Sequence, residues 1–183
     1  MLFELFLYTL ATSLGYASNY LYGALGMYHG SKGVRYYAEV HTTRQNIVVH
    51  VIGMPFTIYG MALWIPGVAE QFFELDPFIT RNALFLYYLG LYSYISLDVC
   101  VYYCFMYFPA ILCGYYTYEG TNTDIVVGLT TSTLALTFQE IVGHNWGGDP
   151  PSRPEGVFNA ILYAKYFSSQ SLKNILRYNR YRS

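Results

Sequence analysis

The sequence predicts an all-α fold: a polytopic membrane helical bundle with about five spans and a short interfacial helix near the C-terminus. One observation is composition, because 54% of the 183 residues are hydrophobic and only 11% are charged. A water-soluble domain carries about 25% charged residues. The other observation is spacing, because the few charges leave long stretches without any Asp, Glu, Lys or Arg. Since a helix needs about 20 apolar residues to cross the hydrocarbon core, we expect these stretches to lie in a membrane.

Five charge-free stretches define the expected spans. They run between Glu4 and Lys32, Arg44 and Glu70, Arg81 and Asp98, Asp98 and Glu119, and Asp124 and Glu140. The first, second and fourth are long enough to span, and the other two would need a polar residue at the membrane surface. The first lacks the basic start of a secretory signal, so residues 1–28 are expected to form a retained N-terminal membrane helix.

Residues 83–118 leave two topologies open. Their length suffices for two tight spans with a turn near Asp98, or for one long tilted or broken helix in which Pro109 kinks or begins a segment. If this stretch crosses twice, four spans separate the 32–46 loop from His144. Four is an even number, so the loop and His144 would then lie on the same side of the membrane.

The C-terminal part differs from the rest in length and charge. Residues 157–167 are too short to span and predict an interfacial amphipathic helix. The end of the chain, including residues 169–183, is basic and contains no acidic residue, which by the positive-inside rule places it in the cytosol. We expect residues 29–168 to form one membrane domain between this tail and the N-terminal helix. The net charge of −1 gives no reason to expect nucleic-acid binding.

The first group of unusual polar residues lies before and within the second span. Tyr37 and His41 are four residues apart, as are Asn46 and His50, so each pair would share a face of a helix. His41 and His50 are nine residues apart and would point in opposite directions on one continuous helix. Both can face one site only if the helix begins between them, and the Thr-Thr step there is a suitable N-cap.

The second group lies at the end of the last span. Glu140 and His144 have helical i, i+4 spacing, and the glycines and prolines after residue 146 would end the helix. Asp149 follows on the loop, and Arg153 could pair with a substrate carboxylate. Histidine and carboxylate side chains at one membrane face predict a site for non-haem iron, zinc or manganese. The alternative is that the histidines only hydrogen-bond between helices.

At these two groups the sequence resembles the membrane-embedded 2-hydroxy fatty acid dioxygenases. The first motif of that family matches Tyr37, His41, Asn46, His50 and Pro55. The second motif resembles the IVGH sequence that ends at His144 and the Arg-Pro step at 153–154. Glu140 stands where the family has Gln, and Gly148 stands where it has Glu, with Asp149 one position later. The resemblance covers roughly residues 34 to 168.

The resemblance implies an oxidoreductase of the endoplasmic reticulum membrane that uses Fe(2+) and O2 to shorten a 2-hydroxy long-chain fatty acid by one carbon. It implies that His41, His50 and His144 bind the iron and that Tyr37 and Asn46 orient them. Glu140, Asp149 and Arg153 are the expected catalytic residues, with Asp149 as the substitute acid. Each of these roles is expected from the position of the residue in the two motifs.

The expected partners are membrane lipid, the 2-hydroxy fatty acid and O2, and a homo-oligomer is left open. The metal site and the C-terminal tail are expected on the cytosolic side.

Two other functions remain as alternatives. One is a zinc- or manganese-dependent membrane lipid hydrolase that uses the same residues. The other is a structural or scaffolding membrane protein with a degenerate site, which the altered second motif favours.

Overall fold

The computed structural model describes residues 2–25, 32, 34–35, 38–150 and 157–180. The chain is 88% helical, and the described residues contain no strand, which confirms the all-α prediction. The helices are α1 (Leu2–Ala24), α3 (Arg44–Phe73), α4 (Pro77–Ser93), α5 (Leu97–Thr117), α6 (Asn122–Phe138), the π-helical turn η1 (Gln139–Gly143), α7 (His144–Gly147) and α8 (Val157–Arg180).

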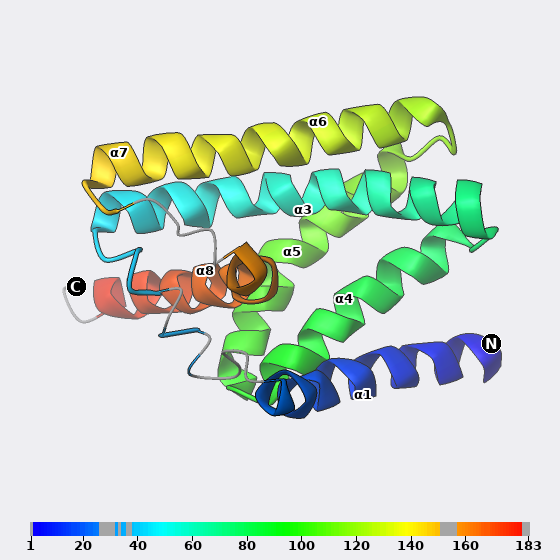
Figure 1. Ribbon diagram of the computed structural model, residues 1–183, viewed down its shortest axis with the longest axis horizontal. Helices are drawn as coiled ribbons and strands as arrows, with labels where there is room; N and C mark the ends of the chain where they lie inside the picture. Colours follow the sequence, from blue (N-terminus) through cyan, green and yellow to red (C-terminus); the bar gives the residue numbers. More distant parts are fainter. Residues whose placement is uncertain (1, 26–31, 33, 36–37, 151–156, 181–183) are drawn as a thin grey trace.

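The helices form two close pairs, which α5 and α8 join. Helices α3 and α6 are antiparallel, whereas α1 and α4 run in the same direction. Helix α3 packs along the continuous α6–η1–α7 rod, and α1 packs along α4 on the other side of the molecule (Figure 1). Helix α5 crosses obliquely between the pairs, and α8 contacts both α3 and α5. The beginning of α3 and the end of the α6–α7 rod therefore lie at the same end of the molecule.

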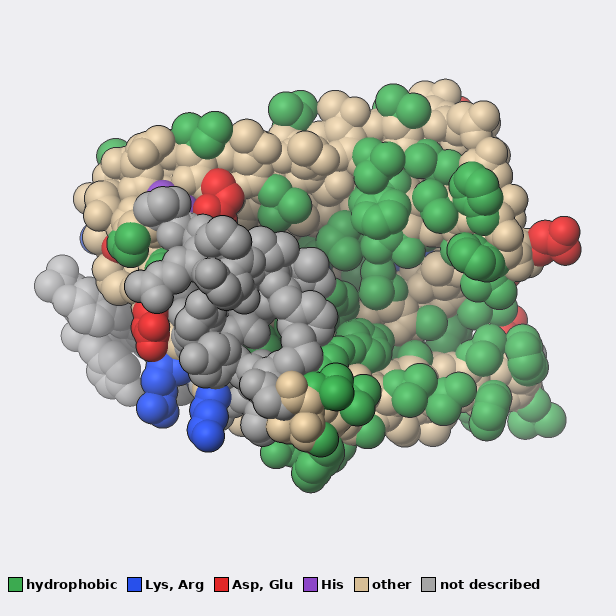
Figure 2. Space-filling view, viewed as in Figure 1, with side chains coloured by type: hydrophobic (Ala, Val, Ile, Leu, Met, Phe, Trp, Pro, Cys, Tyr) green, Lys and Arg blue, Asp and Glu red, His purple; other side chains and the backbone are tan. Residues whose placement is uncertain are grey.

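Three helical segments are long and apolar enough to cross a membrane: α3, α5 and the 26-residue rod Asn122–Gly147. Among the described residues, α1 and α4 do not reach that length and hydropathy, so the structure supports three of the five expected spans by this criterion. Figure 2 shows hydrophobic side chains gathered over the right-hand part of the visible face, among which few charged side chains appear. This distribution is consistent with a membrane protein.

The ambiguous stretch 83–118 forms two helices. Helix α4 ends at Ser93 and α5 begins at Leu97, and the carbonyl of Tyr92 accepts bonds from the backbone N–H groups of residues 95 and 96 in the turn between them. Asp98 lies in the first turn of α5, and Pro109 lies inside that helix. Four helical passes, α3 to α6, thus connect the two polar groups and return the chain to the end where it started.

Glycines allow both helix pairs to approach closely. A Cβ at Gly60 of α3 would lie 2.6 Å from the carbonyl oxygen of Gly128, and a Cβ at Gly128 would lie 2.7 Å from the carbonyl oxygen of Gly60. In the other pair, a Cβ at Gly15 would collide with the carbonyl of Tyr87, and one at Gly90 with that of Thr12. Close backbone contact through small residues is the usual way in which helices associate in membranes.

Helix α3 continues through Pro66 because another helix replaces the lost backbone donor. Proline has no N–H, so the carbonyl of Ala62 four residues earlier has no helical partner. The Nε of Arg81 from α4 donates to that carbonyl oxygen at 2.9 Å. A buried guanidinium therefore restores the hydrogen bonding of the longest helix.

Helix α8 differs from the expected short interfacial helix. It has 24 residues, and residues 162–169 are buried in the bundle. Two tyrosine hydroxyls fix it, because Tyr92 donates to the carbonyl oxygen of Leu162 at 2.7 Å and Tyr107 to that of Lys165 at 3.1 Å. A helical segment too short to span can also pack inside the bundle, and this third position is the one that α8 takes. The helix also extends to Arg180, into the segment expected as a separate tail.

Candidate metal centre

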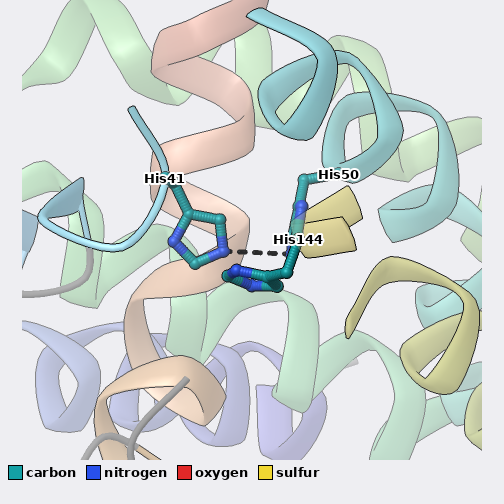
Figure 3. A group of neighbouring side chains, drawn as sticks. All are labelled: His41, His50 and His144. Atoms are coloured by element: carbon teal, nitrogen blue, oxygen red, sulfur yellow. Dashed lines mark hydrogen bonds between the residues drawn. The ribbon is translucent and has the colours of Figure 1, made fainter. Parts of the chain in front are cut away.

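Three histidines from distant parts of the sequence meet at one end of the bundle (Figure 3). His41 lies on the loop before α3, His50 lies in the second turn of α3, and His144 is the first residue of α7. Each offers a ring nitrogen, and these nitrogens lie within 4.8 Å of one another. All three side chains are buried, with relative exposures of 2%, 2% and 3%. The structure thus brings together the three residues that the sequence proposed as ligands.

The N-cap of α3 explains how His41 and His50 face each other. Thr43 precedes the helix in an extended conformation, so the chain changes direction between the two histidines as the spacing required. The Nε2 atoms of His41 and His50 are 3.1 Å apart. Two imidazole nitrogens bound to one ion at about 2.1 Å lie roughly 3.0 to 3.4 Å apart, whether the geometry is octahedral or tetrahedral. This pair therefore already has the separation of two metal ligands.

Hydrogen bonds to the far side of His50 determine which nitrogen is available. Its Nδ1 lies 3.0 Å from the backbone carbonyl oxygen of Asn46, an acceptor, so Nδ1 carries the proton. The lone pair is then on Nε2, which points at His41. A carbonyl that fixes the tautomer in this way is a common feature of histidines that bind metals. For both Nε2 atoms to bind an ion, the proton that His41 donates across this contact would have to move to its Nδ1.

His144 supplies a third nitrogen with unused capacity. Its Nε2 is buried and has no hydrogen-bond partner among the described residues. A carboxylate oxygen of Glu140 lies 3.5 Å away, at ion-pair distance, which confirms the expected i, i+4 proximity. The ring centres of His41 and His144 are 4.9 Å apart, and the ring centres of His50 and His144 are 5.8 Å apart. A shift of about 1 Å in one helix turn would place all three nitrogens at bonding distance from a common point.

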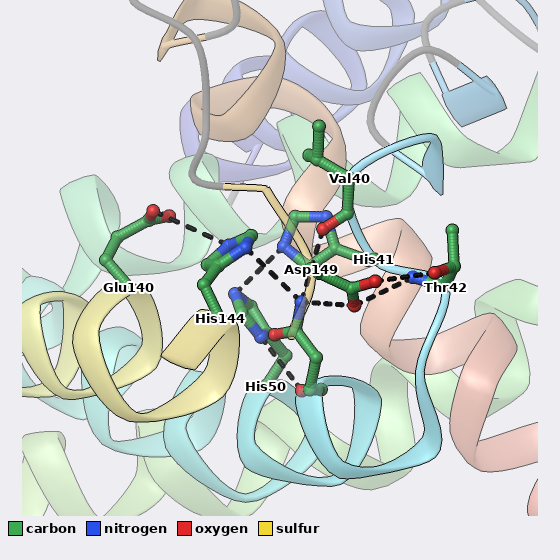
Figure 4. A network of polar contacts seen from close by, with 8 residues as sticks. Val40, His41, Thr42, His50, Glu140, His144 and Asp149 are labelled. Carbon is green, nitrogen blue, oxygen red and sulfur yellow. Dashed lines mark hydrogen bonds and ion pairs between the residues drawn. The ribbon is translucent and has the colours of Figure 1, made fainter. Parts of the chain in front are cut away.

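Asp149 holds the loop that carries His41 (Figure 4). One oxygen accepts bonds from the backbone N–H of Thr42 at 3.0 Å and of Thr43 at 3.1 Å, and from the hydroxyl of Thr43 at 2.9 Å. The other accepts from the hydroxyl of Thr42. The loop after α7 is thereby tied to the start of α3. Asp149, expected as a catalytic acid, thus has both oxygens engaged beside the histidines.

The charge of this carboxylate is stabilised where it lies. Burial acts to raise the pKa of Asp149, but hydrogen bonds from Thr42, Asn46 and Thr43 outweigh it and hold the pKa well below its usual range. A carboxylate that accepts several such bonds stays ionised at any pH that the folded chain meets. Asp149 therefore contributes a fixed negative charge next to the histidines.

Asn46, which the motif resemblance implies to orient the histidines, contacts both the loop before α3 and His144. Its amide nitrogen donates to Asp149 at 2.9 Å and to the carbonyl oxygen of Val40 at 3.2 Å, which uses both of its protons. The same nitrogen lies 3.4 Å from Nδ1 of His144. Its side chain is fully buried. Loss of this amide would disturb both halves of the site.

In the π-helical turn η1, the neighbouring residues Gln139 and Glu140 point in different directions: one is buried and the other is partly exposed. Gln139 is buried, and its amide nitrogen donates to the hydroxyl of Thr57 at 3.1 Å and to the carbonyl oxygen of Ala135 at 2.9 Å. Glu140 is 43% exposed and lies at the edge of the histidine group. A π-turn holds one more residue than an α-turn, and such turns often occur at functional sites. In a regular helix, Glu140 is the residue four positions before His144, where the resembling motif has Gln. In the structure, Gln139 is the residue that lies buried between the helices.

A glycine allows α7 to lie against α3. A Cβ at Gly143 would lie 2.6 Å from the side-chain oxygen of Asn46 and 3.3 Å from the ring of His50. A Cβ at Gly147 would collide with the hydroxyl of Thr43. The glycines beside His144 therefore set the distance between the two halves of the site.

Two predicted site residues, Tyr37 and Arg153, lie outside the described residues. Three residues that the sequence reasoning assigned no role in the site, Thr42, Thr43 and Gln139, fix its geometry. The Thr-Thr step was noted only as a helix cap. Nothing in the spacing indicates that Asp149 accepts bonds from it, because the two segments are more than 100 residues apart.

No protein-family model, curated protein or solved structure matches this chain. The functional assignment therefore depends on the chemistry of the site. Three buried imidazoles with a carboxylate at their edge are a donor set suited to a divalent transition metal, with positions left for exogenous ligands.

Proposed function

We propose that this chain is a membrane-embedded metalloenzyme in which His41, His50 and His144 bind Fe(2+), and that it shortens 2-hydroxy long-chain fatty acids by one carbon with O2. In the balanced reaction, the acid R–CH(OH)–COOH and O2 give R–COOH, CO2 and water. The bond between the carboxyl carbon and the hydroxyl-bearing carbon breaks, and O2 is reduced.

The observation that carries the proposal is the convergence of three buried imidazole nitrogens within 4.8 Å. Burying three such groups together without a ligand leaves polar atoms poorly satisfied: Nε2 of His144 has no hydrogen-bond partner among the described residues, and the nearest carboxylate oxygen, from Glu140, is 3.5 Å away. A metal ion would satisfy them at once. Histidine and carboxylate sites with open positions are typical of non-haem iron enzymes that use O2.

The substrate class follows from the motif resemblance and from the setting. The bound iron would supply O2 activation and a site for the hydroxyl and carboxylate oxygens of the acid. Glu140 is the half-exposed acid at the edge of the histidines, so it is placed to exchange a proton between the substrate hydroxyl and water. Asn46 and Asp149 hold the histidines in place. The apolar bundle surface around the centre suits an acyl chain.

A metal-dependent lipid hydrolase would use the same ligands but would need no O2. A scaffolding protein would bind no metal. Metal content and O2 dependence, measured on one preparation, therefore distinguish both alternatives from the proposal.

The direct test is to purify the chain in a neutral detergent and load it with Fe(2+) without air. O2 and 2-hydroxypalmitic acid are then added, and the products are measured by mass spectrometry. The proposal expects a 15-carbon acid that forms only when both iron and O2 are present. His50→Ala and His144→Ala should each lose bound iron and product.

A matched control is Ser132→Ala, which changes a buried polar residue of α6 that bonds only within its own helix. This variant should keep wild-type iron content and turnover. Product formation by either histidine variant at the wild-type rate would contradict the ligand assignment. Activity that is independent of O2 and supported by zinc would instead favour the hydrolase.

A further inference from the structure

A polar hollow lies at the end of the bundle opposite to the histidines, where α3 ends and α6 begins (Figure 1). Its volume is about 210 Å³, whereas a single water needs about 10–15 Å³. The hollow therefore has room for an organic group. Five polar side chains line it: Glu70, Gln71, Tyr118, Thr121 and Asn122.

The hollow is open to the surroundings at the level of the lipid head groups. The side chains of Glu70, Gln71, Thr121 and Asn122 are exposed. Helix α3 has 30 residues, which corresponds to about 45 Å along its axis. Since the hydrocarbon core is about 30 Å thick, the ends of a spanning helix of this length reach the head-group layers. A ligand can thus enter from the membrane surface or from water.

A glycine keeps the acidic wall of the hollow uncovered. Gly120 has a φ of 73°, a backbone conformation that favours glycine. A Cβ at this position would lie 3.9 Å from a carboxylate oxygen of Glu70. A side chain that extends from that Cβ would lie beside the carboxylate, so glycine leaves the approach to Glu70 free.

Glu70 has no counter-charge in the hollow. One of its oxygens accepts a bond from the hydroxyl of Tyr118 at 2.6 Å, and it forms no ion pair with a described residue. Arg81 is the only Lys or Arg between residues 45 and 152. Its side chain is buried, with its guanidinium carbon 5.3 Å from the centre of the Tyr118 ring. The hollow therefore presents a carboxylate without a neighbouring cation of its own.

The helix ends around the hollow also favour a positive ligand. Helices α3 and α5 both end here, and the C-terminus of a helix carries a partial negative charge. Helix α6 begins here, and a free helix N-terminus binds anions. Asp124 already occupies that position, because its carboxylate accepts the backbone N–H of Thr121 at 2.8 Å and of Glu119 at 3.2 Å. An anion would thus meet carboxylates where it needs donors.

The acceptors in the lining match an ammonium group better than a metal ion. Calcium is usually bound by six to eight oxygens from several carboxylates, and Glu70 is the only acid that lines the hollow. A primary ammonium has three N–H donors. The second oxygen of Glu70 and the side-chain oxygens of Gln71 and Asn122 are acceptors of the kind that such a group requires.

We propose that this hollow binds a primary ammonium group, carried by a lipid head group or by a free amine, with Glu70 as its counter-ion and Gln71 and Asn122 as further acceptors. Glu70 lies 20 residues beyond His50 on α3, which corresponds to about 30 Å along the helix. The site is therefore separate from the metal centre and does not depend on the reaction proposed there.

The test is a binding measurement on the purified, metal-free chain in a neutral maltoside detergent, followed by native mass spectrometry. Dioleoylphosphatidylethanolamine is compared with dioleoylphosphatidylcholine, which has the same acyl chains and phosphate but no ammonium N–H. Ethanolamine and choline form the matching pair of free amines. We expect wild type to bind the primary ammonium of at least one pair five times or more tightly than its trimethylated counterpart. Glu70→Gln, which keeps an acceptor for Tyr118 but removes the charge, should abolish that preference.

Glu74→Gln is the matched control, because it removes an acid from the same end of α3 that does not line the hollow. This variant should keep the wild-type preference. A preference within the lipid pair identifies a head group as the ligand, and a preference only within the free pair identifies a soluble amine.

Equal or reversed affinities in both pairs for wild type would overturn the proposal. So would a Glu70→Gln variant that has wild-type helix content by circular dichroism and retains the preference. Iron content of Glu70→Gln should equal that of wild type, so a failure here is distinguishable from a failure at the histidine centre.

Discussion

Replacing Asp149 tests whether a single carboxylate holds the two halves of the metal centre together. In Asp149→Ala the buried amide of Asn46 loses its 2.9 Å acceptor, and the two threonines lose theirs. A hydrogen bond from a buried group to a charged acceptor contributes about 1.5–3 kcal/mol. The bonds from Thr42 and Thr43 contribute less, because these residues are partly exposed and water can replace the carboxylate. We expect a loss of roughly 2–4 kcal/mol in the free energy of unfolding.

The contribution of Asp149 to the free energy of unfolding should depend on pH. Its pKa is depressed in the folded chain, so the unfolded chain binds more protons at acidic pH. The stability that Asp149 contributes is then fully present above its ordinary pKa of 3.8 and is lost as the pH falls through that value toward the lower folded pKa. Asp149→Asn, which keeps the shape but not the charge, should differ from wild type by a constant amount above about pH 5 and by less below pH 4.

The assay is SDS-induced unfolding in mixed micelles, followed by tyrosine and tryptophan fluorescence from pH 3 to 8. Asp76→Asn is the matched control, because Asp76 caps α4 at the other end of α3 and asparagine caps a helix equally well. A cost below about 0.5 kcal/mol for Asp149→Ala would refute the clamp, since even one buried bond of this kind exceeds it. A wild-type minus Asp149→Asn difference that does not shrink on acidification would refute it as well.

Three further predictions concern the packing around the centre and α8. Gly143→Ala should lower iron affinity at least tenfold with unchanged helix content by circular dichroism, because its Cβ would lie 2.6 Å from the oxygen of Asn46; unchanged iron affinity would contradict the close packing. Gln139→Leu should cost about 1 kcal/mol in SDS unfolding, since the hydroxyl of Thr57 loses its donor, and no loss would show that the bond is not needed. Burial lowers the pKa of Lys165 to about 7, so the unfolded chain binds more protons between about pH 7 and the ordinary lysine value of 10.5. Lys165→Met should therefore be more stable than wild type at pH 7, with a difference that shrinks toward pH 10, and a constant difference would contradict it.

Charge spacing predicted the helical class and left two helices in residues 83–118 as one of two open topologies. Helical spacing grouped His41 with His50, and the motif resemblance added His144 to them as the third expected ligand. Parity of the passes placed the loop and His144 at one end only on the condition that residues 83–118 form two passes, as α4 and α5 do. The burial of α8 was missed because its contacts depend on hydroxyls of Tyr92 and Tyr107, which spacing does not reveal. The separate positions of Gln139 and Glu140 were missed because a π-turn is a tertiary outcome that residue counting does not anticipate.

The roles of Asp149 and Arg81 were also beyond sequence reasoning. Asp149 was identified as an acid near the histidines, but its partners lie more than 100 residues earlier in the chain. Arg81 was treated only as the boundary of a charge-free stretch. Its contact with Ala62 arises from the pairing of α3 with α4, and periodicity within one helix carries no information about the partner helix.

The proposed function requires that the three histidines bind one iron ion. The most direct measurement is the metal content of the purified chain after anaerobic loading with Fe(2+) and removal of free metal, by inductively coupled plasma mass spectrometry. The proposed site predicts about one iron per wild-type chain and almost none in His50→Ala and His144→Ala. Iron-free wild type, or histidine variants that retain the same iron, would contradict it.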